Sequence, residues 1–129
     1  MEKQKFYITT PIYYPSGKFH IGQSYTTVAA DVTARYKKLR GHDVFYLTGT
    51  DEHTQKVEEK AKEKGLSSAE YIEPIVLDAQ RLWKSLDIEY NDFIRTSETR
   101  HKIGVQKIFK IFLEQGDIYK GEYEGWYCT

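Results

Sequence analysis

The residues near the N-terminus that could best do chemistry are His20, Gly22 and Gln23, at the expected start of a long helix. They follow a β-branched and aromatic run, residues 6–10, which ends at Pro11 and is predicted to be a strand. The first turn of a helix has free backbone N–H groups and the positive end of the helix dipole, and so it attracts anions. Gly22 allows close approach of a ligand, and His20 and Gln23 can both donate hydrogen bonds to it. This pattern fits a phosphate group that gains charge during phosphoryl or nucleotidyl transfer. The alternative is a plain helix start with a structural histidine.

A second polar cluster, Asp51 to His53, follows another expected strand at residues 43–48. Because neighbouring parallel strands end at the same edge of a sheet, Asp51 and His53 are expected to face the same crevice as His20. A carboxylate in that crevice would pair with a cation such as a substrate ammonium group. Two alternatives stay open. Asp51 could cap the next helix, or Asp51 and His53 could bind a metal, although no third ligand is evident.

The elements that position these residues alternate between strand and helix patterns. Apolar residues at gaps of three and four predict the helices, and the nearly continuous apolar run at 43–48 predicts a strand buried on both faces. The expected strands are 6–10, 43–48 and 93–96, the expected helices are 21–39, 52–64, 67–87 and 98–115, and 116–129 is expected to form a strand or hairpin. This order predicts an α/β fold with a doubly wound, Rossmann-like parallel sheet.

Two of the expected helices carry further predictions. Ser67 and Glu70 form a capping-box pattern, and Pro74 is expected to kink or restart the helix that follows. The last helix is expected to turn one apolar face inward, formed by Val105, Ile108, Phe109, Phe112 and Leu113.

Composition sets limits on the class of protein. The chain has 129 residues, enough for one domain, and 19 basic residues balance 19 acidic ones. There is therefore no overall basic field to attract nucleic acid, and any RNA contact would be local. The single cysteine, Cys128, excludes an internal disulfide framework. With no signal peptide or membrane span in the sequence, the expected class is a soluble intracellular domain.

Residues 20–23, HIGQ, resemble the HIGH signature of class I aminoacyl-tRNA synthetases. The longer strings TTPIYYPSG and TGTDEH, at their spacing in this chain, resemble the methionyl-tRNA synthetase family specifically. The resemblance continues through NDFIRTSETR at 91–100 to GDIYKGEYEGWYC at 116–128, and so it covers essentially the whole chain.

The resemblance implies an enzyme that activates methionine with ATP and Mg²⁺, and then transfers it from methionyl-adenylate to tRNA(Met) in the cytoplasm. Gly22 is implied to lie under the nucleotide, with His20 and Gln23 on the ATP phosphates as the catalytic residues. Asp51 is implied to hold the α-ammonium group. The residues implied to line the methionine pocket are Pro11, Ile12 and Tyr14.

The resemblance also implies a division of the chain. Residues 1–115 would form the first half of the Rossmann catalytic domain, and 116–129 would begin a connective insertion that continues in a longer enzyme. Cys128 matches the first cysteine of a zinc knuckle, so Zn²⁺ is expected in that complete enzyme, with its other ligands beyond this chain. Two rival readings stay open: a stand-alone HxGH nucleotidyltransferase, and a truncated half-domain that binds ATP or methionine without catalysis.

Two residues depart from the family pattern. Gln23 stands where histidine is usual, and Thr54 stands where glycine is common. A β-branched residue does not easily adopt positive φ, so the loop after His53 is expected to differ from that of the family.

We expect Gln23→His to retain or raise the rate of adenylate formation in a complete enzyme. Glutamine keeps a hydrogen-bond donor but carries no charge, whereas histidine offers both. The rate of methionyl-adenylate formation checks this. A loss of about tenfold or more, which corresponds to about 1.4 kcal/mol, would show instead that Gln23 is tuned to this site.

Overall fold

The computed structural model describes residues 2–126. Contacts divide the chain into two compact units, Met1–Glu98 and Thr99–Thr129. None of the described helices is long and apolar enough to cross a membrane.

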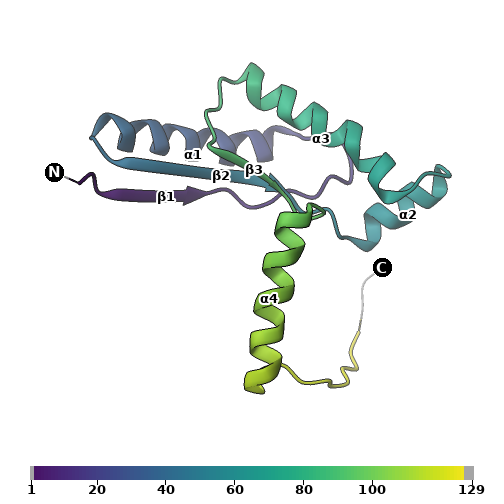
Figure 1. Cartoon of the computed structure of the whole chain (residues 1–129). Helices are drawn as coiled ribbons and strands as arrows, with labels where there is room; N and C mark the ends of the chain where they lie inside the picture. The colour runs from purple at the N-terminus through teal and green to yellow at the C-terminus, as the bar shows by residue number, and fades with distance from the viewer. Residues whose placement is uncertain (1, 127–129) are drawn as a thin grey trace. The chain divides into compact units, whose positions relative to one another are not determined.

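The first unit is a three-stranded parallel sheet with its connecting helices (Figure 1). The strands lie in the order β1-β2-β3, and successive strands are joined through helices. The elements are β1 (Lys5–Thr9), α1 (Ile21–Leu39), β2 (Asp43–Thr50), α2 (Gln55–Glu63), α3 (Ser68–Ser85) and β3 (Asp92–Arg95). This arrangement confirms the predicted α/β, Rossmann-like fold class.

Helices α1 and α3 cover the same face of the sheet (Figure 1). Both crossovers advance in the same direction across the sheet, and crossovers of one hand then place their helices on one face. Ile88 and Tyr90 contact both of the clusters that result. The α1 cluster is Ala30, Ala34, Val44 and Tyr46, and the α3 cluster is Tyr13, Val76, Trp83 and Phe93.

The prediction that the second strand is buried on both faces is wrong for this unit. Val44 and Tyr46 are buried under α1, but Phe45 points the other way and is 45% exposed. Its neighbour on β1, Tyr7, is 61% exposed, and the two rings lie 6.0 Å apart between centroids. The physical reason is the alternation of side chains along a strand, combined with helices on one face of the described unit.

The helix starts agree with the sequence in two cases and correct it in one. Helix α1 has the predicted bounds, and Ser67 and Glu70 form the predicted capping box at α3. Hydrogen bonds from Ser67 lower the pKa of the Glu70 carboxyl. Helix α2, however, begins only after Thr54, whose hydroxyl accepts a hydrogen bond from the Val57 N–H at 3.2 Å. Thr54 is therefore the cap, and the alternative that Asp51 caps this helix is wrong.

Thr54 and Pro74 are both accommodated without a break. Thr54 has φ −125°, an extended conformation that a β-branched residue adopts readily. Helix α3 runs through Pro74 to Ser85 without interruption, because apolar residues on either side of the proline, Ile72 and Val76, are buried. Tertiary packing outweighs the hydrogen bond that Pro74 removes.

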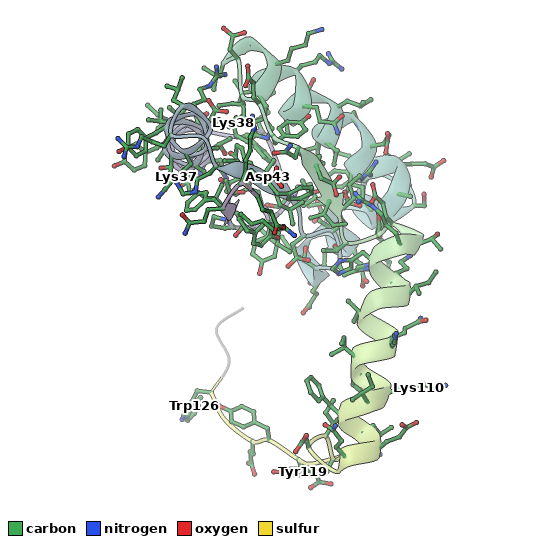
Figure 2. All side chains as sticks on the ribbon, turned by 60° about the vertical axis from the view of Figure 1, so that its left-hand side comes forward. Lys37, Lys38, Asp43, Lys110, Tyr119 and Trp126 are labelled. Carbon is green, nitrogen blue, oxygen red and sulfur yellow. The ribbon has the colours of Figure 1, made fainter. Side chains whose placement is uncertain are left out.

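The second unit contains α4 (Thr99–Gln115) and the segment that follows it. No residue of α4 is buried within its own unit, so the predicted inward apolar face is not formed there. An amphipathic helix buries that face only against a partner surface. Residues 116–126 contain no strand, contrary to prediction, while 127–129 lie outside the described residues. Figure 2 shows Lys110 on α4 and Tyr119 and Trp126 on the following segment.

Gly49 allows β3 to lie close to β2. It pairs with Ile94, and a Cβ atom at Gly49 would lie 2.0 Å from the Ile94 carbonyl oxygen. We expect Gly49→Ala to lower the free energy of unfolding by about 1–3 kcal/mol, the usual cost of overpacking. Urea denaturation followed by tryptophan fluorescence measures this, because Trp83 is fully buried.

Gly17→Ala is the matched control for this prediction. A Cβ atom at Gly17 meets nothing within 4 Å, so the change in stability should stay within about 0.5 kcal/mol. Equal effects of the two substitutions would contradict the steric account of Gly49.

Candidate functional site

A backbone bridge joins the loop after β1 to the end of β2. The Tyr13 N–H donates to the Gly49 carbonyl at 3.0 Å, and the Asp51 N–H donates to the Tyr13 carbonyl at 2.9 Å. Tyr13 and Thr50 form a parallel β-bridge, so the pairing of β1 with β2 resumes beyond Pro11. The structure therefore brings the expected methionine-pocket segment, 11–14, directly beside Asp51.

Side chains in this segment divide into a core group and an exposed group. Tyr13 is 8% exposed, and its hydroxyl lies 2.9 Å from the Thr27 Oγ1 on α1. Ile12 and Tyr14 are 39% and 60% exposed. The residue that anchors the loop is thus Tyr13, whereas its neighbours Ile12 and Tyr14 remain free to contact a ligand.

An aromatic cluster fixes the turn that leads into α1. Tyr13 stands before the turn and Phe19 after it, and both rings pack on Trp83 of α3, with centroid distances of 6.1 and 5.7 Å. Inside the turn, the Ser16 carbonyl accepts hydrogen bonds from Lys60 Nζ and, at 3.4 Å, from Tyr71 Oη. The start of α1 is therefore positioned by α2 and α3, which the sequence pattern did not indicate.

His20 is the cap of α1. Its Nδ1 accepts a hydrogen bond from the Gly22 N–H at 3.0 Å, which places the proton of the neutral ring on Nε2. The Gln23 Oε1 in turn accepts from the His20 N–H at 3.0 Å and completes a capping box. The structural alternative for this histidine and the ligand-binding role are compatible, because Nε2–H of His20 and the amide group of Gln23 remain as donors.

Gly22 leaves space for the imidazole ring of His20, two residues earlier in the chain. A Cβ atom at Gly22 would lie 2.8 Å from His20 Cε1 and 3.1 Å from His20 Nδ1. The glycine thus leaves room for the imidazole to fold over the end of α1. His20 and Gly22 are exposed, and α1 begins at the edge of the sheet where β2 ends (Figure 1).

Asp51 is partly exposed at that edge, but the next residue, Glu52, is buried, with its side chain 0% exposed. The Glu52 carboxylate accepts hydrogen bonds from Thr50, Arg95 and Ser97. The sequence pattern did not indicate a role for Glu52, because two of these partners lie more than forty positions away. The available signal was the polar run Arg95 to Ser97, which ends the neighbouring parallel strand at the same edge.

The described residues 2–126 contain no group of three or more His, Cys, Asp or Glu side chains that could hold a metal ion. His53 is exposed beside Asp51. The expected zinc ligand, Cys128, lies outside the described residues.

Comparison with known proteins identifies the family. Residues 6–129 match the family model described as tRNA synthetases class I (M). The chain belongs to this family. The methionine–tRNA ligase of Listeria monocytogenes is 67% identical over 128 residues, which cover 99% of this chain and 19% of that ligase. The chain thus spans about a fifth of the length of the curated relatives it matches.

Solved structures agree with the family assignment. Methionyl-tRNA synthetase of Mycobacterium tuberculosis, in complex with methionyl-adenylate, superposes with a TM-score of 0.87 at 36% identity, over 90% of this chain and 23% of that one. The ternary complex of an Agrobacterium radiobacter leucyl enzyme with tRNA and LeuAMS has a TM-score of 0.83 at 26% identity, over 92% of this chain and 16% of the other. The resemblance drawn from HIGQ and TGTDEH is therefore confirmed.

We expect Gly22→Ala to displace the His20 ring while leaving the stability of α1 nearly unchanged. Alanine favours a helix over glycine by about 1 kcal/mol, which offsets a lost cap of similar size. Long-range ¹H–¹⁵N spectra of His20 measure the tautomer, and the variant should lose the pure Nε2–H pattern. Gly104→Ala on α4, where nothing lies within 4 Å of the added Cβ, is the control. Unchanged His20 nitrogen shifts in Gly22→Ala would contradict the steric role of this glycine.

Proposed function

We propose that this chain is the first part of a methionine–tRNA ligase, in which it binds methionine and ATP and supports formation of methionyl-adenylate. Residues 1–115 then belong to the first half of the catalytic domain, and 116–129 begin a connective insertion. Relatives that are 67% and 64% identical to this chain bear the name methionine–tRNA ligase, which supports this proposal.

The observation that carries the proposal is the backbone bridge between Tyr13 and Asp51. Two hydrogen bonds, of 3.0 and 2.9 Å, hold the loop after β1 against the end of β2. Asp51, with its carboxyl group, is thereby held next to the segment that bears the two exposed side chains of Ile12 and Tyr14. An amino acid with an apolar side chain needs both features, because its ammonium group requires a counter-charge and its side chain an apolar contact.

In this proposal Asp51 holds the α-ammonium group of methionine. Pro11, Ile12 and Tyr14 contribute apolar surface to the side-chain pocket. Contact between the thioether sulfur and the Tyr14 ring would favour methionine over aliphatic amino acids of similar size.

The start of α1 binds the ATP phosphates in the same proposal. His20 donates from Nε2–H and Gln23 from its side-chain amide, while Gly22 keeps the backbone accessible to the nucleotide. The carboxylate oxygen of methionine attacks the α-phosphorus in line, the bond from that phosphorus to the bridging oxygen breaks, and pyrophosphate leaves with the electron pair. These residues act by positioning and by stabilising charge on the phosphoryl group.

The remaining assignments follow from the role in translation. Magnesium enters with ATP, held mainly by the phosphates. Methionine passes from the adenylate to tRNA(Met), and the location is cytoplasmic. Zinc, with Cys128 as one ligand, belongs to the complete enzyme.

We expect Asp51→Asn to raise the KM for methionine by about 10- to 100-fold, because a hydrogen bond to a charged group is replaced by a neutral contact. The KM for ATP should change by less than about twofold, since Asp51 faces the amino acid. Methionine-dependent ATP–pyrophosphate exchange by the complete ligase measures both constants.

Asp43→Asn makes the same chemical change at the opposite end of β2. Asp43 is exposed and begins β2, whereas Asp51 follows the end of that strand, so both constants should stay at their original values. Adenylyl transfer to a different acceptor, or binding of ATP and methionine without exchange, would overturn the proposal in favour of a nucleotidyltransferase or a non-catalytic binding domain.

A further inference from the structure

We propose that Glu52 is a positioning residue for methionine binding, which fixes the Asp51 carboxylate through a buried hydrogen-bond network. This inference rests on the proposed function, because it concerns how the proposed ammonium site is held. Glu52 itself is fully buried, so it acts through Asp51 and touches no substrate.

The network joins the ends of two strands beneath Asp51. The Glu52 Oε1 accepts from Thr50 Oγ1 at 2.8 Å and from Arg95 Nε at 2.7 Å, and Oε2 accepts from Ser97 Oγ. The Glu52 N–H donates to Thr96 Oγ1 at 2.7 Å. Strands β2 and β3 end side by side at this edge (Figure 1). A single carboxylate thus gathers three donors from the two strand ends.

Asp51 is held on both sides by this arrangement. Its own N–H donates to the Tyr13 carbonyl at 2.9 Å, and the N–H of the following residue is bound by Thr96. With both flanking peptide groups fixed, the Asp51 backbone has little freedom, although its side chain is partly exposed. Preorganisation of this kind strengthens binding, because the site loses little conformational entropy when the ligand binds.

Burying a charged group such as the Glu52 carboxylate carries a desolvation cost. Burying an ion pair stabilises a fold little compared with apolar residues of similar size, so its value here is geometric. Arg95 compensates the Glu52 charge and also donates to Glu73 on α3 at 2.7 Å. Although burial lowers the pKa of the Arg95 guanidinium, its hydrogen bonds to the two glutamates raise it overall, so Arg95 stays charged. The Glu52 charge is therefore compensated within the network, whereas Asp51 is partly exposed and accessible to an ammonium group.

The test is Glu52→Gln in the complete ligase, followed by methionine-dependent ATP–pyrophosphate exchange. Glutamine keeps the size and one acceptor oxygen, so Thr50 and Arg95 retain a partner, but its amide group cannot accept from Ser97. We expect the KM for methionine to rise by about tenfold and the KM for ATP to change by less than about twofold. The double variant with Asp51→Asn should be no worse than Asp51→Asn alone, because Glu52 acts through Asp51.

Asp31→Asn is the matched control. Asp31 on α1 is also a buried carboxylate paired with an arginine. Its Oδ2 accepts a hydrogen bond from Arg35 Nε at 2.6 Å, and its Oδ1 accepts one from the Glu89 N–H at 2.8 Å. The same substitution there should lower the melting temperature and leave the KM for methionine unchanged. Equal KM values for methionine in Glu52→Gln and the original enzyme, or additive effects in the double variant, would overturn the inference.

A second variant keeps the test decisive if Glu52→Gln does not fold. Ser97→Ala removes one donor to Glu52 and leaves the ion pair with Arg95 intact, so a smaller rise in the KM for methionine is expected, and no rise would overturn the inference. The outcomes also separate the two proposals. No exchange by the original enzyme overturns both, whereas exchange that depends on Asp51 but not on Glu52 overturns only this inference.

Discussion

The arrangement of the site depends on the short backbone bridge between Tyr13 and the end of β2. Pro11 interrupts the pairing of β1 with β2, and the hydrogen bonds of Tyr13 to Gly49 and Asp51 restore it two residues later. Without this bridge, the loop after β1 would not be joined to the end of β2 by backbone hydrogen bonds, and residues 12–14 would not be held next to Asp51. Two peptide hydrogen bonds therefore hold together the two segments of the proposed amino-acid site.

Side-chain alternation then separates the residue that anchors the loop from the residues proposed to bind methionine. Tyr13 points into the core, where its hydroxyl meets Thr27 and its ring meets Trp83, and Ile12 and Tyr14 stay exposed. His20 also combines two roles, because its Nδ1 caps α1 and its Nε2–H remains as a donor. Single residues thus serve both the fold and the proposed chemistry, because different atoms carry the two roles.

Two glycines at the site lie where a Cβ atom would collide with a neighbouring group. Gly49 lies against the Ile94 carbonyl, and Gly22 lies under the His20 imidazole. Neither role needs a positive φ, which among the described residues is found at Asp87 and at three glycines, Gly41, Gly65 and Gly116, all just after helices. The two glycines at the edge of the sheet are needed for space, and those after helices for chain direction.

Local signals in the sequence determined the helix α1, the three strands, the capping box at Ser67 and the parallel order of the elements, because these depend on residues close in the chain. The same signals placed His20, Gln23 and Asp51 at one edge, since parallel strands end together. Tertiary structure alone decided that Tyr13 is core while Tyr14 is exposed, that Phe45 is uncovered, and that Pro74 does not break α3. It also decided the network around Glu52, because Arg95 and Ser97 reach this carboxylate only after β3 has paired with β2. Periodicity and capping are local properties of a chain, whereas burial and long-range hydrogen bonds exist only once distant segments have packed together.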